Sequence, residues 1–250
     1  PIAEAVSAVA DALKKGGRLV YIGAGTSGRM GVLDASECPP TFNSDPAQVV
    51  GLIAGGDTAL RTAIEGAEDH PEFAEADLAK INLSDSDVLV GIAASGRTPY
   101  VVGGLAYAQK VGAVAVGFTC NENNRLAAVS DILICPVVGP EILSGSTRMK
   151  AGTATKLVLN MLTTGAMVLL GKSYGNLMVD LQATNSKLID RSARIVCEMT
   201  DLARDEAESL LARCDGMLKV AIVSHMKQVE PDAARQLLDE ANGHLRTALK

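Results

Sequence analysis

The sequence predicts an α/β protein with three layers, in which a parallel sheet of about five strands is covered by helices on both faces. Three observations carry this prediction. Short apolar runs flanked by glycine recur along the chain, and they are continuous rather than alternating, as in strands buried on both faces. Segments of helical composition lie between them, which favours strand-helix-strand units. With 250 residues, 48% of them hydrophobic, the chain is long enough for one large domain with an appendage.

The elements follow in chain order. Apolar residues at helical spacing predict a first helix from Ile2 to Lys15, which Gly16 and Gly17 end. The five expected strands are Leu19 to Ile22, Val49 to Ala54, Val88 to Ala93, Ala113 to Thr119 and Ile132 to Val138. The helical segments expected between them are Thr58 to Gly66, Thr98 to Val111 and Asn124 to Val129.

The second part of the chain is helical in composition. A long apolar helix is expected to end near Leu170, and an amphipathic helix follows from Leu177 to Met199. After Thr200 the composition changes, and a three-helix appendage is the simplest interpretation, with helices at Leu202 to Cys214, Met217 to Gln228 and Asp232 to Leu249. We therefore expect one domain over residues 1–195 and a helical domain over residues 196–250. Because the chain begins without methionine inside a helix, we also expect residues upstream of Pro1 in the complete protein.

Charge and cysteine usage narrow the function classes. The net charge of −6 argues against broad nucleic-acid binding, so a phosphate site would have to be local. No apolar run reaches about 20 residues and no signal peptide is visible, so we expect a soluble cytoplasmic protein that does not bind membranes. The five cysteines and three histidines are dispersed, which supports neither a disulfide framework nor a zinc site. We expect chemistry without a metal or another cofactor.

The first candidate ligand loop directly follows the first strand. Gly23, Gly25 and Gly28 allow a tight turn, and a helix starting near Thr26 points free N–H groups at the same spot, which suits an anion such as phosphate. Thr26 and Ser27 add hydroxyl donors. The spacing also fits a dinucleotide fingerprint, but the acidic partner expected near the next strand is poor, since Asp57 is the only candidate. The glycine pattern alone is also compatible with a turn that binds nothing.

A second loop repeats this chemistry after the third strand. The stretch Ala94 to Pro99 supplies Ser95, Gly96, Arg97 and Thr98, with the proline at a helix's first turn. Ligands of parallel sheets bind outside the carboxyl ends of the strands. Two such loops, separated in the chain by one strand, therefore predict a joint phosphate cradle.

A third loop precedes the long apolar helix. Residues Gly139 to Lys156 read GPEILSGSTRMKAGTATK, in which Ser144, Ser146 and Thr147 are expected to cap the helix and basic residues add positive charge. A capped helix without a ligand would also explain this segment. The acid, the bases and the nearly all-apolar helix behind them favour a ligand-facing loop backed by a buried or dimer-forming helix.

Four motifs together carry a family resemblance. The strand-end loops resemble the sugar isomerase (SIS) fold. In the order GAGTSGRMGVLDASECPP, EGAED, AASGRTPY and GPEILSGSTRMKAGTATK, the motifs closely resemble the N-acetylmuramic acid 6-phosphate etherase family, and one of them is similar to a signature shared with the glucokinase regulatory protein. The resemblance covers essentially the whole chain and adds a UBA-like character to the C-terminal helices.

The resemblance implies cleavage of the D-lactyl ether at C3 of N-acetylmuramic acid 6-phosphate, giving N-acetylglucosamine 6-phosphate and D-lactate in amino-sugar recycling. It makes Glu37 the proton donor to the departing lactate and Glu68 the base at C2. An ether oxygen β to an aldehyde can leave by such an elimination, for which two carboxyl groups suffice. The substrate-binding and phosphate-binding candidates are Gly25, Thr26, Ser27, Ser95, Gly96, Arg97, Thr98, Glu141, Ser144, Ser146 and Lys150. A homodimer is also expected, formed through the apolar helix.

Two other classes stay open at this point. A non-catalytic sugar-phosphate sensor would need the serine and threonine loops, but it has no use for Glu37 and Glu68 together. An aldose–ketose isomerase would move a proton between C1 and C2 and leave C3 untouched. The plain alternatives are a solvated helix residue for Glu37 and, for Glu68, a turn acid beside its neighbours Glu65 and Asp69.

Overall fold

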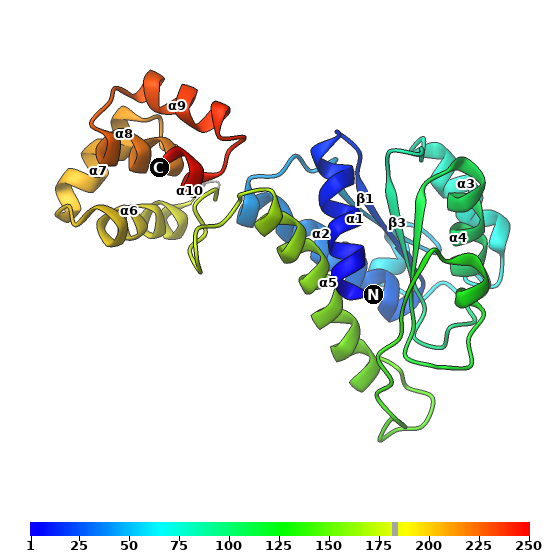
Figure 1. Ribbon diagram of the computed structural model, residues 1–250. Coiled ribbons are helices and arrows are strands. Elements are labelled where there is room, and N and C mark those ends of the chain that lie inside the picture. The colour runs from blue at the N-terminus through cyan, green and yellow to red at the C-terminus, as the bar shows by residue number, and fades with distance from the viewer. Residues whose placement is uncertain (182–184) are drawn as a thin grey trace. The chain divides into compact units, whose positions relative to one another are not determined.

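The computed structural model describes residues 1–181 and 185–250, which form two compact units. The first unit comprises Pro1–Glu37 and Asp45–Ala166, and the second comprises Cys38–Ser44 and Met167–Lys250. The expected domain boundary after residue 195 falls inside a helix of the second unit. Figure 1 shows the sheet with its helices, and it also draws the C-terminal helices of the second unit.

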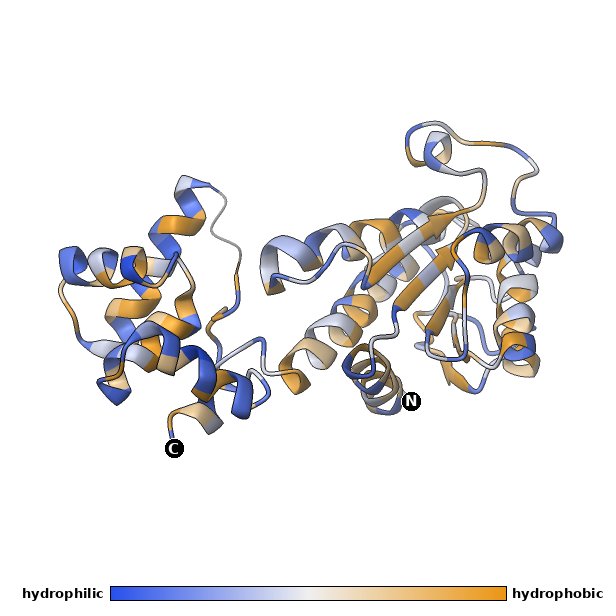
Figure 2. Ribbon diagram, turned by 90° about the horizontal axis from the view of Figure 1, so that it is seen from above, coloured by the Kyte–Doolittle hydropathy of each residue, from blue (hydrophilic) through white to orange (hydrophobic). Residues whose placement is uncertain are grey.

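The first unit is built on a five-stranded parallel sheet, as predicted. The strands are β1 (Leu19–Gly23), β2 (Val49–Ile53), β3 (Val88–Ile92), β4 (Val114–Phe118) and β5 (Ile132–Ile134), in the order β2-β1-β3-β4-β5. All five residues of β1 and of β3 are buried, which explains their continuous apolar sequences. The strands are mostly hydrophobic in Figure 2. The chain leaves β1 toward one edge and returns to place β3 on its other side, so the winding reverses between β1 and β3.

Helices cover both faces of the sheet. They are α1 (Ile2–Lys14), α2 (Gly25–Phe42), α3 (Pro71–Lys80), α4 (Pro99–Val111) and α5 (Lys150–Leu169). In Figure 1, α1, α2 and α5 lie on one side of the strands, and α3 and α4 lie on the other. Tyr100 and Leu105 of α4 belong to the same buried cluster as Ile22 and Leu89 of the sheet. The sheet and its two helical layers confirm the predicted fold class.

Two glycines in the strands set the distance between layers. A Cβ on Gly51 would lie 2.7 Å from the Cα of Val32 in α2, and a Cβ on Gly91 would lie 2.7 Å from the Cγ of Leu105 in α4. Neither position has room for a side chain. The helices therefore pack directly on the strand backbone at these points.

The helix predictions between the strands are partly wrong. Helix α3 is absent from them, because its sequence is rich in acids and only Ala74 and Leu78 are buried, which leaves a weak apolar stripe. Residues 58–66 are not one helix: a 3-10 turn, η1 (Asp57–Leu60), is followed by turns. The segment 124–129 likewise contains only the 3-10 turn η2 (Leu126–Val129).

A partly buried ion pair joins the starts of β1 and β3, at the opposite end of these strands from the loops. The carboxylate of Asp87, just before β3, accepts hydrogen bonds from the backbone N–H of Arg18 (2.9 Å) and from its guanidinium (2.7 and 3.0 Å). It also accepts the backbone N–H of Ser84 at 3.0 Å. Burial alone would raise the pKa of Asp87, but the bonds from Arg18 and Ser84 outweigh it and hold this pKa below its ordinary value.

The second unit is helical. Its helices are α6 (Ser186–Thr200), α7 (Arg204–Arg213), α8 (Leu218–Lys227), α9 (Pro231–Glu240) and α10 (Leu245–Ala248). The third helix predicted for the appendage is two helices, because Asn242 and Gly243 adopt φ angles of 50° and 76° and break it. The helix predicted from Leu177 begins only at Ser186: residues 177–181 are not helical, and residues 182–184 of the prediction lie outside the described residues.

Inside the second unit, Lys219 of α8 is buried. Its ammonium contacts the carboxylate of Asp180 at 2.9 Å and the carbonyl of Gly243 at 2.8 Å. Asp180 also pairs with Lys172 at 3.0 Å. This cluster fastens the segment that precedes α6 to α8 and to the turn before α10.

In the part of the chain that the structure describes, no helix is both long and apolar enough to span a bilayer.

Candidate functional site

The two predicted phosphate loops lie at neighbouring strand ends. β1 pairs directly with β3, with Gly23 opposite Ile92 at their carboxyl ends. The loop after β1 starts α2, and the loop after β3 precedes α4. This point, where the winding of the sheet reverses, is where parallel α/β sheets bind their ligands.

The first loop is a tight connection between β1 and α2. Gly25 has a φ of 52°, in the left-handed region. A Cβ on Gly28 would lie 2.7 Å from the carbonyl oxygen of Gly23, so the turn closes only with glycine there. Thr26 and Ser27 are half-buried in the first turn of α2, and within the described residues neither hydroxyl is hydrogen-bonded to another protein group. Their hydroxyls and the free N–H groups of the helix end are available to an anion.

The second loop turns sharply at Gly96, whose φ is 70° and where a Cβ would lie 2.2 Å from the Cβ of Asn124. Ser95 is exposed, and its hydroxyl accepts the backbone N–H of Arg97 at 3.3 Å. Thr98 occupies the N-cap position of α4 without a side-chain capping bond. Among the residues that the structure describes, its hydroxyl therefore has no hydrogen-bond partner at the positive end of the helix.

The third loop is fixed by an acid. The carboxylate of Glu141 accepts the backbone N–H groups of Lys150 and Ala151, each at 2.9 Å, at the start of α5. The bonds from Ala151 and Lys150 lower the pKa of Glu141 below its ordinary value. Glu141 therefore takes the capping position for which the sequence predicted the hydroxyls of Ser144, Ser146 and Thr147.

The second and third loops line one cavity of about 370 Å³. Ser95, Glu141 and Ser144 are among the residues around it, whereas Ser146 and Lys150 are not in its described lining. The first loop lies close by, because a Cβ on Gly152 of α5 would be 3.7 Å from the methyl carbon of Thr26. The three loops named from the sequence thus gather around the start of α5.

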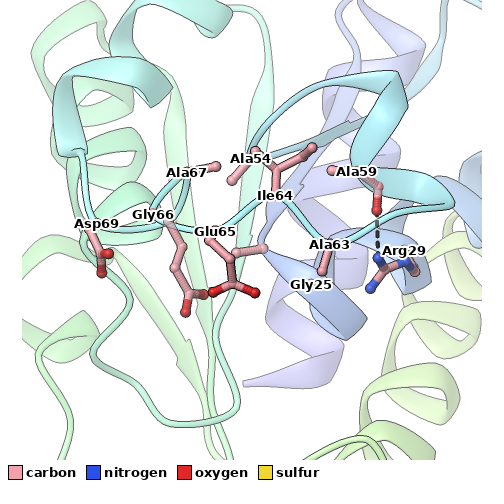
Figure 3. A pocket seen from close by; sticks show the side chains of 12 residues that line it. Gly25, Arg29, Ala54, Ala59, Ala63, Ile64, Glu65, Gly66, Ala67 and Asp69 are labelled. Atoms are coloured by element: carbon pink, nitrogen blue, oxygen red, sulfur yellow. Dashed lines mark hydrogen bonds between the residues drawn. The ribbon is translucent and has the colours of Figure 1, made fainter.

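Glu68 lies in a second cavity, of about 210 Å³, beside the first loop. Figure 3 shows Gly25 and Arg29 of α2 on one side of it and Glu65 and Asp69 on the other. The backbone carbonyl of Glu68 accepts the N–H of Tyr100 at 3.0 Å, which ties this acidic turn to the start of α4. The structure therefore places Glu68 next to the first loop.

Glu37 lies outside the described linings of both cavities. It is exposed on α2, and it is not among the described residues that line either cavity. Twelve residues separate it from Gly25 in one helix, which is about 18 Å at 1.5 Å per residue. Glu37 thus lies about three helical turns from the loop beside Glu68, and neither of the two described cavities is lined by both carboxylates.

Asp34 is a buried acid on α2 that the sequence analysis did not single out. Its carboxylate accepts the hydroxyl of Tyr21 in β1 at 2.8 Å, the amide of Asn160 at 2.7 Å and the hydroxyl of Thr163 at 3.2 Å, both in α5. Burial raises the pKa of Asp34 above its ordinary value, although these bonds act in the opposite direction. In the sequence, Asp34 stands among apolar residues in GVLDA, and this was the signal that could have indicated a buried acid. Its network holds α2, β1 and α5 together.

Cys120 lines the cavity between the second and third loops. Burial, followed by the proximity of Cys135 and Glu141, raises the pKa of Cys120 to about 11, which disfavours the reactive thiolate. Over residues 1–181 and 185–250, no group of three or more His, Cys, Asp or Glu side chains is arranged to hold a metal ion.

Comparisons with solved structures support the fold. A putative phosphosugar isomerase involved in capsule formation from Bacteroides fragilis superimposes with a TM-score of 0.51 at 21% identity, over 67% of this chain and 78% of that one. An Escherichia coli CFT073 protein solved in complex with A5P gives 0.50 at 19% identity, over 68% of this chain and 79% of its own. At this level of identity the two structures show a shared fold and nothing about function.

Comparisons of sequence reach further. Residues 1–109 match the glucokinase regulatory protein N-terminal SIS domain, and residues 67–165 match the SIS domain. An N-acetylmuramic acid 6-phosphate etherase of Rhodopirellula baltica is 64% identical over 99% of this chain and 82% of its own length. Another, from Photobacterium profundum, is 59% identical over the same shares. With such identity over nearly its whole length, the chain belongs to the N-acetylmuramic acid 6-phosphate etherase family of SIS-fold proteins.

Proposed function

We propose that this protein is an etherase which cleaves the D-lactyl ether of N-acetylmuramic acid 6-phosphate, yielding N-acetylglucosamine 6-phosphate and D-lactate. The observation that carries the proposal furthest is the cavity in which Glu68 lies beside Gly25 and the first turn of α2. A base next to an anion-binding helix end suits a sugar whose phosphate and reacting carbon lie a few bonds apart. The relatives named above are etherases of this substrate. We place the reaction in the cytoplasm.

The proposed reaction starts from the open-chain sugar, in which the C1 aldehyde acidifies the proton on C2. Glu68 removes that proton, and the electron pair forms the C2–C3 double bond as the C3–O bond breaks. Glu37 donates a proton to the departing lactate oxygen. Water then adds at C3 with Glu37 as the base, and Glu68 returns a proton to C2. The sum is substrate plus water giving the two products, so no electrons are left over and no cofactor is required.

The phosphate is assigned to the first two loops. Ser27, Ser95 and Thr98 would donate hydroxyl hydrogens, and the N–H groups at the starts of α2 and α4 would add their dipoles. The third loop, with Glu141 and Ser144 around the neighbouring cavity, would contact the rest of the sugar. The unit built on the sheet would thereby form the sugar-phosphate domain, and the C-terminal helices would form a UBA-like domain without a catalytic part.

We assign Glu37 to the active site of a second copy of the chain. About 18 Å of helix separates it from the first loop of its own chain, too far for a concerted proton transfer. A homodimer that places α2 of one copy over the loops of the other would join Glu37 to Glu68. On α5, Leu157 and Met161 are 46% and 50% exposed, and they offer an apolar surface for such an interface.

The two other classes are not favoured. An aldose–ketose isomerase agrees with the names of the solved structures, but their identity to this chain is only 19% and 21%, and such similarity establishes the fold alone. A sugar-phosphate sensor agrees with the regulatory-protein SIS match. The identity of 59–64% to etherases over nearly the whole chain outweighs both.

The test measures D-lactate release from N-acetylmuramic acid 6-phosphate and, separately, exchange of the C2 hydrogen of N-acetylglucosamine 6-phosphate in deuterated water. Exchange requires only the base at C2, whereas ether cleavage also requires an acid at C3. We expect Glu37→Gln to abolish lactate release and to keep some exchange, and Glu68→Gln to abolish both. Each loss should reach roughly 10²–10⁴-fold, the usual worth of general acid–base assistance.

The control is Glu65→Gln, which removes a carboxylate from the same cavity as Glu68 and should leave exchange within about threefold of wild type. Absence of lactate release by the wild-type protein would refute the proposed function. Wild-type exchange in the Glu68 variant, or normal lactate release by the Glu37 variant, would refute the roles, and Glu141 would become the next candidate.

A further inference from the structure

Arg29 is an arginine of α2 that binds backbone rather than an acid. It follows Gly28 at the start of the second turn of α2 and is half-buried. Its Nε donates to the carbonyl of Leu60 (3.0 Å), and its Nη2 donates to the carbonyl of Ala59 (2.6 Å). Among the described ion pairs, none involves Arg29. Removing a cation from water costs free energy unless hydrogen bonds replace the lost hydration. For Arg29 these hydrogen bonds come from two backbone carbonyls and not from a carboxylate, which indicates a structural role for its guanidinium.

The two carbonyls belong to the end of η1 (Asp57–Leu60), the turn that follows β2. The last carbonyls of a short helix have no partner within it, and a guanidinium there satisfies them and matches the negative end of the dipole. Arg29 thus fastens the chain between β2 and α3 to the second turn of α2, directly after the first loop. Figure 3 draws the bond to Ala59 at the edge of the cavity.

The same segment carries Glu68, and it is held at few points. Residues 61–66 are all exposed. On the far side, Ala67 is buried and the carbonyl of Glu68 accepts the N–H of Tyr100. On the near side, Arg29 holds residues 59 and 60. The exposed stretch therefore spans two anchors, of which Arg29 is the one attached to the predicted phosphate loop.

We propose that Arg29 is a positioning residue, which sets the distance between the phosphate held at the start of α2 and the carboxylate of Glu68. This inference rests on the proposed function of the site. Arg29 itself touches neither the phosphate nor the reacting carbon. Lysine is a poor substitute, because one ammonium on a flexible stem does not reproduce two parallel bonds to neighbouring carbonyls.

The experiment compares Arg29→Lys and Arg29→Met with the wild type in three measurements on the full chain: kcat for lactate release, the rate of C2 exchange, and the Kd of N-acetylglucosamine 6-phosphate by calorimetry. A base displaced by about 1 Å costs on the order of 10²-fold in rate. We expect Arg29→Met to lower kcat and exchange together by about that factor and Arg29→Lys to lie between, while Kd changes by less than about threefold. The matched control is Arg61→Met, which removes an equally positive but exposed side chain of the same segment and should leave all three values unchanged.

A fourth measurement, limited proteolysis, tests the attachment of this segment by Arg29 and does not depend on enzymatic activity. Trypsin cleaves after Arg61, which is exposed, and release of the segment from α2 should speed this cut about tenfold in both Arg29 variants. The proposal is overturned if exchange and cleavage both stay within twofold of wild type. It is also overturned if Kd weakens as much as kcat falls, since Arg29 would then bind the phosphate. A wild-type protein that neither exchanges C2 nor releases lactate contradicts the proposed function instead, and the cleavage result still tests the anchor.

Discussion

Loss of the Ser95 and Thr98 hydroxyls should weaken binding of the phosphorylated sugar much more than binding of the unphosphorylated sugar. Thr98 stands at the N-cap of α4 without a capping bond, and Ser95 accepts only a backbone N–H, so both can donate to a phosphate. The double variant Ser95→Ala with Thr98→Ala should weaken binding of N-acetylglucosamine 6-phosphate by roughly 10²- to 10⁴-fold, since each of the two hydrogen bonds to a charged group contributes about 1.5–3 kcal/mol. Calorimetry with the phosphorylated sugar and its unphosphorylated counterpart measures the difference.

The unphosphorylated sugar serves as the internal control for this prediction, because it lacks the group that the two hydroxyls would bind. Ser36→Ala provides the matched protein control: its hydroxyl is exposed on α2 and donates to the carbonyl of Leu33. Equal losses for both sugars in the double variant would refute the assignment of the phosphate to this loop.

Asp87 and Arg18 join the starts of β1 and β3, so their pair belongs to the scale of the elements. Asp87→Asn leaves the guanidinium without its anion and should lower the free energy of unfolding by about 3 kcal/mol near pH 7, the low end for a broken buried pair. The pKa of Asp87 is lowered in the folded state, so its contribution is complete above the ordinary value of 3.8 and is lost as the pH falls through the folded pKa.

Denaturant titrations of wild type and Asp87→Asn at a series of pH values check both statements. The gap between the two proteins should be constant from pH 6 to 8 and should narrow below about pH 4. Asp85→Asn, an exposed neighbour in the same loop, should change stability by less than about 0.5 kcal/mol. A stability difference between wild type and Asp87→Asn that grows as the pH falls would contradict the lowered pKa of Asp87.

At this same scale the sequence was informative about strands and less so about what joins them. Continuous apolar runs predicted all five strands, because a strand buried on both faces needs no polar partner along its length. Helix α3 was missed, since its stability comes from packing against α4 and not from its own stripe. The loops with Ser95 and Glu68 could be named from residue type, but the bonds of Arg29 to two carbonyls and the cap by Glu141 depend on backbone positions that only the folded chain defines.

For the whole molecule we expect a homodimer that shares its active sites. Mixing Glu37→Gln with Glu68→Gln chains, each inactive alone, should restore about a quarter of the wild-type lactate release: half of the random dimers are mixed, and each of these has one intact site of two. Unfolding and refolding the mixture exchanges the chains, and sedimentation measures the association state. A stable monomer at micromolar concentration contradicts the dimer, and a mixture without activity contradicts the sharing.

Leu157→Glu provides the interface variant for that experiment. It places a charge on the exposed apolar side of α5 and should weaken association. Lys156→Glu, at the adjacent exposed position, changes charge without removing apolar surface and serves as its control.

The contact of α2 with Gly51 also limits how such a protein can diverge. With the backbone of Val32 lying against the strand, the helix cannot slide or tilt without a clash, and neither can the turn at its start. Adaptation to another sugar would then have to proceed through insertions and exchanges in the segments 61–66 and 139–149, which the sheet does not hold. New specificities should therefore arise by changing the rim of the site and leaving its floor untouched.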